Sequence, residues 1–98
     1  MNRDLHPTDG ARYLLELDGE HGDAARARYR AAIYTPDTEF TAAATLGDDG
    51  SVELAPTGAP DELHARLTVI ARLVARDAAR RRDEGMPVWP QRILRWRR

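Results

Sequence analysis

The chain lacks the residue types on which several structures and chemistries depend. It has no cysteine, which excludes a disulfide framework and a thiolate metal site. Its only serine, Ser51, falls in a predicted turn, and no glycine-rich phosphate loop is present. The three histidines, His6, His21 and His64, lack the spacing of a metal site or a nucleophile–base pair. A weak metal site at His21 and Asp23 is the alternative to a plain polar turn there, and the turn is favoured. We therefore expect no enzyme, no metal and no cofactor.

Long apolar runs are also missing. The first ten residues, MNRDLHPTDG, contain none, which predicts that the chain carries no signal peptide. No stretch approaches membrane-spanning length, so no membrane contact is expected. The length of 98 residues suits one domain with a single core. A soluble, cytoplasmic protein is the expectation.

Lysine is absent as well, and all fifteen basic side chains are arginine. Their distribution is uneven: residues 1–65 hold five arginines against thirteen acids, whereas residues 66–98 hold ten arginines against three acids. Such asymmetry indicates a basic segment that meets nucleic acid, a membrane surface or an acidic protein face. Mutual neutralisation within one fold or one dimer is the favoured alternative, because the acidic part of the chain would repel a polyanion.

The first half of the chain alternates apolar and polar residues, the pattern of half-buried strands. Four strands are predicted, over residues 12–20, 25–35, 39–46 and 51–55. A turn at TPDT pairs Ile33 with Phe40 and, along the same two strands, Tyr29 with Ala44. The loop GDDGS, with a left-handed Gly50, predicts the pairs Leu46 with Val52 and Thr45 with Glu53. A loop through HGD predicts three more, namely Leu15 with Tyr29, Glu16 with Arg28, and Asp18 with Arg26.

After residue 59 the apolar period lengthens to that of a helix. Apolar residues recur at three- and four-residue spacing over 60–84, at Leu63, Leu67, Ile70, Val74 and Ala78. Pro60 suits a first helical position, Gly85 suits a left-handed cap, and Pro87 blocks continuation. The predicted fold is α+β: a four-stranded antiparallel β-meander followed by one long helix across its apolar face.

The last eleven residues, VWPQRILRWRR, combine two tryptophans with four arginines. Trp89, Ile93 and Trp96 fall at i, i+4 and i+7, which favours a short helix that begins at Pro90. As a strand, the same residues would mix apolar and charged side chains on both faces, so the helix is preferred. Monomers rarely leave two tryptophans in water. We therefore expect this tail to be docked. The simplest site is in cis, at the open end of the sheet beside the long helix, and docking in trans or on a foreign partner are the alternatives.

Two surfaces are candidates for binding. Val69 and Leu73 widen the apolar stripe of the long helix beyond what a small sheet needs, which indicates helix pairing in a dimer. Arginines at four-residue spacing line one ridge of that helix and repel each other, so an acidic surface, internal or foreign, is expected nearby. The outer sheet face offers small residues and one aromatic, either as solvated sheet or as a protein contact: Ala32, Tyr34, Thr41, Ala43, Thr45 and Ala55.

The sequence predicts one domain over 1–98, with a flexible N-terminus (1–10), the meander (11–56), the helix (60–84) and the tail (88–98). The leading functional hypothesis is a non-enzymatic protein-interaction module, an adaptor or regulatory subunit, that is homodimeric or binds another protein with an acidic surface. The predicted binding residues are Arg72, Arg76, Arg80, Trp89, Arg92, Arg95 and Trp96.

The alternative is a nucleic-acid-binding protein in which the same arginines contact phosphates and tryptophan or tyrosine stacks on bases. Four strands followed by a helix resemble the topology of single-strand-binding transcriptional coactivators, without a matching motif. The resemblance implies a role for Arg26, Arg28, Arg30 and Tyr34 on the strands.

Overall fold

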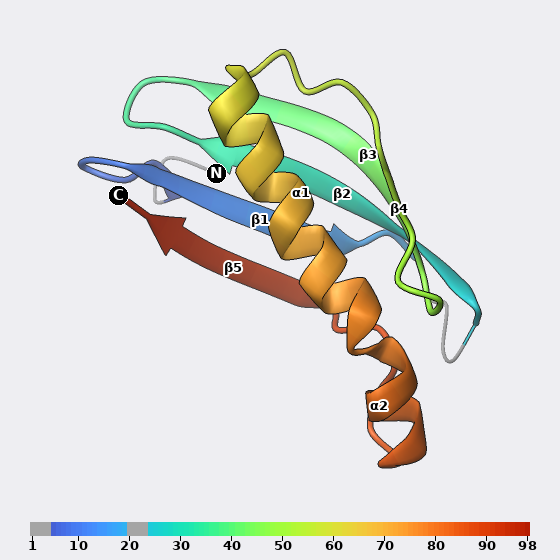
Figure 1. The fold of residues 1–98 in the computed structure, drawn as a ribbon. Helices are drawn as coiled ribbons and strands as arrows, with labels where there is room; N and C mark the ends of the chain where they lie inside the picture. The colour runs from blue at the N-terminus through green and yellow to red at the C-terminus, as the bar shows by residue number, and fades with distance from the viewer. Residues whose placement is uncertain (1–4, 20–23) are drawn as a thin grey trace.

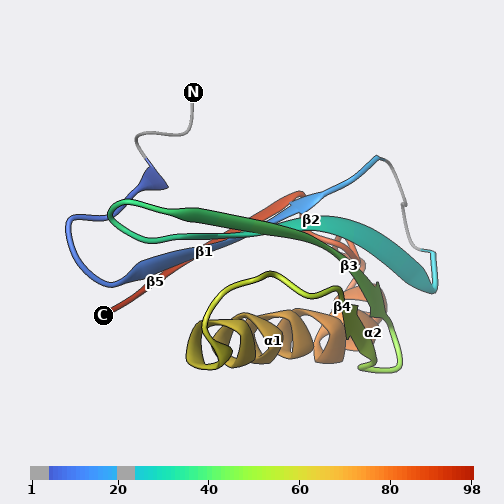
Figure 2. The same ribbon diagram turned by 90° about the horizontal axis from the view of Figure 1, so that it is seen from above.

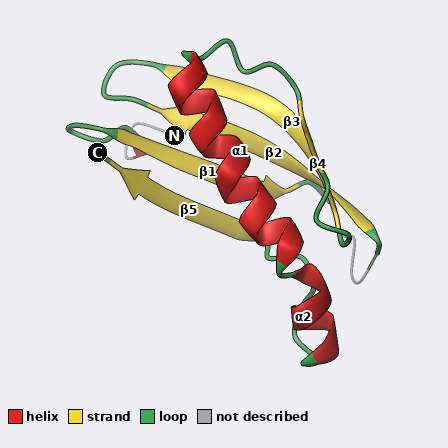
Figure 3. Cartoon of the chain, in the orientation of Figure 1, coloured by secondary structure: helices red, strands yellow, loops and turns green. Residues whose placement is uncertain are grey.

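The computed structural model describes residues 5–19 and 24–98. A five-stranded antiparallel sheet carries two helices on one face, in two layers (Figures 1 and 2). The strands are β1 (Ala11–Leu17), β2 (Arg26–Tyr34), β3 (Glu39–Gly47), β4 (Val52–Leu54) and β5 (Arg92–Arg97), in the order β4-β3-β2-β1-β5. The helices are α1 (Asp61–Arg76) and α2 (Ala78–Asp83). The predicted α+β class, with a meander followed by a helix across it, is confirmed (Figure 3).

Two of the three predicted strand registers are confirmed. Ile33 lies opposite Phe40 and Tyr29 opposite Ala44, as the turn at TPDT requires. Leu46 lies opposite Val52 and Thr45 opposite Glu53. The second hairpin closes through Gly50, whose φ of 90° is the left-handed conformation predicted for it. Turn chemistry was therefore sufficient to fix the pairing at both short loops.

The third predicted register, between β1 and β2, is wrong by two residues. Leu15 lies opposite Ala31 and Glu16 opposite Arg30, not opposite Tyr29 and Arg28. The Glu16 carboxylate lies 3.6 Å from the Arg30 guanidinium, an exposed ion pair. A two-residue shift leaves every side chain on its predicted face, because side chains alternate with a period of two. The alternation therefore could not detect the error, and the loop through HGD falls largely outside the described residues.

The predicted helix over 60–84 is present but bent. It divides at Asp77 into α1 and α2, and the Arg81 guanidinium donates a hydrogen bond of 2.7 Å to the Val74 carbonyl across the bend. Figure 1 shows α1 running diagonally over the sheet and α2 projecting beyond its edge. The predicted glycine cap is confirmed: Gly85 has a φ of 73°, and the Met86 amide donates to the Arg81 carbonyl at 2.9 Å.

The predicted C-terminal helix is wrong. The tail forms strand β5, which pairs with β1 so that Ile93 lies opposite Leu15 and Trp96 opposite Arg12. The backbone of β1 favours a strand over a helix for the tail. The outer edge of β1 would otherwise present unpaired amide and carbonyl groups, and β5 forms hydrogen bonds with them. The sequence of the tail does not alternate apolar and polar residues because, on the face of β5 that carries the helices, only Ile93 is buried. Arg95 and Arg97 share its face but are exposed.

The main core lies between the sheet and α1. Leu67, Ile70, Ala71 and Ala75 of α1 pack there against a set of buried strand residues that includes Tyr13, Leu15, Ala27, Tyr29, Ile33 and Leu46. The glycine at position 10, where the chain enters β1, has a φ of 72°, and a side chain there would meet the Arg97 carbonyl oxygen. Gly10 thus lets the start of β1 approach the end of β5.

A second, smaller cluster lies on the outer sheet face. Leu14, Ala32 and Tyr34 are buried there, with Leu5 packed against them. The His6 ring meets the Tyr34 ring edge-on at 5.3 Å, and His6 Nδ1 lies 2.7 Å from the Thr35 carbonyl oxygen. Residues 5–10, within the N-terminus predicted to be flexible, therefore contact the sheet. The prediction that Tyr34 is a surface aromatic is wrong, because these residues cover it.

Candidate protein-binding surface

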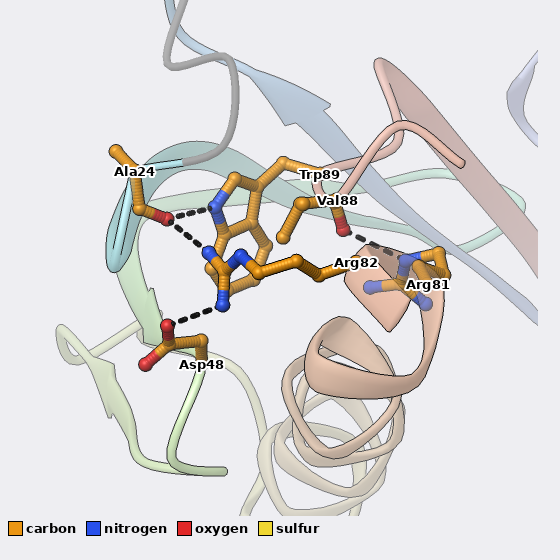
Figure 4. Close-up of polar contacts among 6 residues, drawn as sticks. All are labelled: Ala24, Asp48, Arg81, Arg82, Val88 and Trp89. Atoms are coloured by element: carbon orange, nitrogen blue, oxygen red, sulfur yellow. Dashed lines mark hydrogen bonds and ion pairs between the residues drawn. The ribbon is translucent and has the colours of Figure 1, made fainter. Parts of the chain in front are cut away.

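Trp89 is part of the core. Its side chain is 3% exposed, and its indole N–H donates a 2.7 Å hydrogen bond to the Ala24 carbonyl (Figure 4). Its ring meets the Tyr29 ring edge-on at 6.4 Å. The Tyr29 hydroxyl in turn donates to the Pro90 carbonyl at 2.7 Å. The tail is thus docked in cis, at the end of the sheet beside the helices. Trp89, predicted as a binding residue, presents no free ring face.

Two arginines of α2 fix neighbouring segments: Arg81 contacts the segment between α2 and β5, and Arg82 contacts the turn between β3 and β4. Arg81 donates from Nε to the Val88 carbonyl at 2.7 Å, and Arg82 forms an ion pair of 2.8 Å with Asp48 (Figure 4). Arg80 lies within ion-pair distance of Asp77, at 3.4 Å, and Glu84, at 3.6 Å, in its own helical segment. The acidic groups expected near the arginine ridge therefore include these internal ones, and they neutralise its C-terminal part.

The other predicted arginines have no carboxylate partner in the part of the chain that the structure describes. Within residues 5–19 and 24–98, Arg72, Arg76, Arg92 and Arg95 form no ion pair with a carboxylate. The same is true of Arg97, which the sequence analysis did not select. These charges lie in two places: Arg72 and Arg76 on α1, and the remaining three on β5.

The exposed apolar residues of α1 lie between these two groups of arginines. Val69 and Leu73 are 52% and 47% exposed. On one side they line a hollow of roughly 420 Å³ with Asp49, Gly50, Arg72 and Arg76. On the other side they line a hollow of roughly 400 Å³ that extends toward β5, together with Glu62, Ala65, Arg66, Ile70 and Arg97.

Strand β5 is the second exposed apolar element. Leu94 is 37% exposed and Trp96 is 42% exposed. The indole N–H of Trp96 donates to the Asp9 carbonyl at 3.0 Å, and the Arg98 guanidinium lies 5.5 Å from the centre of the Trp96 ring. Arg98 also pairs with the Asp9 carboxylate at 3.2 Å. Trp96 is therefore oriented by the N-terminal segment while much of its surface stays in solvent.

We call the exposed residues of these two elements the β5 edge surface. Its helix side comprises Arg66, Val69 and Leu73 of α1 with Arg95 and Arg97 of β5, and its outer side comprises Leu94 and Trp96, on the opposite face of the sheet. Of its members, Arg95 and Trp96 were predicted to bind a partner, and Val69 and Leu73 were predicted to pair helices in a dimer. Leu94 and Arg97 were not predicted because the tail was assigned to a helix. The signal that could have found them is the alternation of Leu94 with Arg95 and Trp96 with Arg97.

The outer sheet face has a different electrostatic character. A hollow of roughly 590 Å³ lies over it, lined by Glu16, Leu17, Asp18, Tyr29, Arg30, Thr41, Ala42 and Ala43. Arg30 lies 3.6 Å from Glu16 and 3.5 Å from Glu39, so its charge is neutralised. With Tyr34 buried, the exposed aromatic on this side of the sheet is Trp96 of β5, and the Arg98 guanidinium already lies over its ring.

The two deeply buried tyrosines that face the helices, Tyr29 and Tyr13, have raised pKa values. Burial raises the pKa of Tyr29 to about 12, because the phenolate would lose its hydration. Burial also raises the pKa of Tyr13, and the nearby Arg66 opposes that shift. The Tyr13 hydroxyl has no hydrogen-bond partner of acceptable geometry among the described residues. Both tyrosines are therefore neutral hydroxyls at ordinary pH.

The part of the chain that the structure describes contains no group of three or more side chains arranged to hold a metal ion. The weak site considered at His21 and Asp23 lies outside the described residues. In the same described ranges, neither helix has the length and apolar character needed to cross a membrane. Comparisons with protein-family models, with curated proteins and with solved structures found no match.

Proposed function

We propose that the protein is a non-enzymatic interaction module that binds an acidic protein partner through the arginines and exposed apolar residues of α1 and β5. The observation that carries the proposal is the position of Val69 and Leu73. Each exposes about half of its side chain between two groups of arginines that form no ion pair among the described residues. A desolvated apolar contact with a charged rim is the usual anatomy of a protein interface.

An acidic protein fits this surface better than a second copy of the chain. Pairing two copies through β5 would bring Arg92, Arg95 and Arg97 of one copy close to the same residues of the other, and like charges repel. An acidic protein also fits this surface better than nucleic acid does. A base would have to stack on the only exposed tryptophan, Trp96, and the Arg98 guanidinium already lies over its ring. The acids on the outer sheet face would add repulsion of a polyanion.

A binding experiment with a variant that places acidic residues in the apolar patch tests the proposal. Immobilised wild-type protein should retain acidic proteins from a nuclease-treated lysate of the source organism, and a Val69→Asp/Leu73→Asp variant should retain none of them. Because both side chains are about half exposed, the variant should melt within a few degrees of wild type. If retention is seen only with an untreated lysate, is abolished by nuclease and falls steeply with salt, the ligand is instead nucleic acid.

Light scattering separates the remaining alternative. A monomer mass at high micromolar concentration is expected for a module whose partner is a different protein. A dimer mass that the Val69→Asp/Leu73→Asp variant converts to monomer would show that the surface is occupied by a second copy. That outcome would overturn the proposal of an acidic partner there.

A further inference from the structure

Strand β5 is an edge of the sheet, and its backbone has one free side. The Leu17 amide donates to the Gln91 carbonyl at 2.8 Å, just before the strand begins. In an antiparallel ladder the residues that exchange hydrogen bonds alternate along the strand. Ile93, Arg95 and Arg97 therefore direct their amide and carbonyl groups toward β1. Arg92, Leu94 and Trp96 direct theirs away from it, toward solvent.

Two of these outward carbonyls are occupied by the protein's own arginines. Arg95 Nη1 donates to the Leu94 carbonyl at 2.9 Å, and Arg97 Nη1 donates to the Trp96 carbonyl at 2.9 Å. Each guanidinium thus folds back over the residue that precedes it. A row of unpaired strand groups is a template for adding another strand, and charged side chains are a common means of guarding it. At β5 the guards are Arg95 and Arg97.

Protection alone does not account for the side chains of this strand. An edge that only needs protection is best left polar, whereas β5 exposes Leu94 and Trp96 in alternation with its guards. Arg95 and Arg97 lie on the face that carries α1, with Leu94 and Trp96 on the opposite face, because successive strand residues point to opposite faces. The two faces of the strand edge therefore offer different chemistry.

We propose that β5 accepts an extended protein segment as a sixth strand, and that the segment alternates acidic and apolar residues. This inference rests on the proposed function and names its ligand class. The acidic side chains of the segment meet Arg95 and Arg97 on the α1 side, and its apolar side chains contact Leu94 and Trp96 on the outer side. Main-chain hydrogen bonds supply affinity in this mode of recognition, and alternate side chains supply specificity.

The arginine guards make acidic residues a condition for binding. A carboxylate is a stronger acceptor for a guanidinium than a neutral carbonyl, because the hydrogen bond is charge-assisted. A carboxylate on the incoming segment therefore draws each guanidinium off its carbonyl. The carbonyls of Leu94 and Trp96 are then free to accept amide hydrogens from the segment. A neutral or basic segment leaves the guards in place and the edge closed.

The test uses a fluorescently labelled ten-residue peptide that alternates glutamate and valine, measured by fluorescence anisotropy against the full chain. Binding should be at least tenfold tighter than for peptides that alternate lysine with valine or serine with valine. It should also be at least tenfold tighter than for a peptide with five glutamates followed by five valines, which has the same charge and composition. Equal affinity for the alternating and the block glutamate–valine peptides would overturn the inference, because charge alone would then explain binding.

Three variants locate the binding site. Arg95→Gln/Arg97→Gln should weaken binding of the alternating peptide at least tenfold, whereas the charge-matched Arg72→Gln/Arg76→Gln should change it less than threefold. Leu94→Pro removes an amide hydrogen that points away from β1, and should abolish binding while the far-ultraviolet circular dichroism is retained.

The opposite ranking of the two double variants would overturn the inference and leave the proposed function standing, because acidic ligands would then bind at α1. The same conclusion follows if the peptide fails to bind while acidic proteins are still retained through Val69 and Leu73. If neither the peptide nor any acidic protein binds, both proposals fail.

Discussion

Replacing Trp89 with alanine should destabilise the protein more than any other change in the tail. The indole is 3% exposed, donates to the Ala24 carbonyl and packs edge-on against Tyr29. A buried tryptophan removes roughly 150–250 Å² from water. At about 25 cal/mol per Å² that burial contributes ~4–6 kcal/mol, and measured aromatic-to-alanine costs in cores are about 3–5 kcal/mol.

The matched control is Trp96→Ala, which removes the same side chain from the same tail. Because Trp96 is 42% exposed, little more than half of its area is buried, and its loss should cost about 2–3 kcal/mol. Urea unfolding gives both free energies, and the Trp89 variant should also melt at least about 12 °C below wild type, since 1 kcal/mol corresponds to roughly 4–8 °C in a domain of this size. Equal losses in the two variants would refute the account of Trp89 as the residue that anchors the tail.

Two further changes, the second with a matched control, test the docking of the tail. Tyr29→Phe removes the hydrogen bond to the Pro90 carbonyl and should cost about 1–2 kcal/mol in urea unfolding. Its second effect appears in alkali: the stability contributed by the raised Tyr29 pKa is fully present below pH 10 and lost as the pH rises toward 12, so the melting temperature of Tyr29→Phe should fall less steeply over that range than that of wild type. With no lysine in the chain, few other groups titrate there to obscure the difference. Gly10→Ala should cost more than Gly58→Ala, because both have positive φ but only the first adds a side chain against the Arg97 carbonyl; similar melting temperatures for the two would contradict the close approach of β1 and β5.

The sequence was informative wherever a short loop closed a strand pair. Gly50 and the turn at TPDT each fix a loop length and a backbone conformation, so the pairs Leu46 with Val52 and Ile33 with Phe40 followed from local chemistry. The longer loop before β2 fixes neither. Two registers that differ by two residues then place the same side chains inward, and only contacts between strands, such as that of Glu16 with Arg30, choose between them.

The tail was mispredicted because its conformation depends on a strand more than seventy residues earlier. Trp89, Ile93 and Trp96 fit a helical stripe as well as any short segment could, and a segment of this length has almost no intrinsic preference that tertiary contacts cannot override. The free edge of β1 supplied those contacts. Trp89 packs into the core just before β5 begins, whereas Trp96 lies within β5 on the sheet face opposite the helices.

This error also explains why only part of the candidate surface was found. Arginines were selected by their spacing on a helix, so Arg72 and Arg76 were included, whereas Arg97 was not. The guarding hydrogen bonds of Arg95 and Arg97 depend on which carbonyls of β5 point outward, and that is known only once the partner strand and register are known. No sequence pattern alone carries this information.

Amide hydrogen exchange along β5, followed by NMR with and without the alternating glutamate–valine peptide, tests the central claim most directly. The account predicts that the amides of Leu94 and Trp96, which face the free edge, become at least tenfold more protected when the peptide binds. The amides of Ile93 and Arg95, which already face β1, should keep their exchange rates. Unchanged exchange at Leu94 and Trp96 in the presence of saturating peptide would contradict strand addition at this edge.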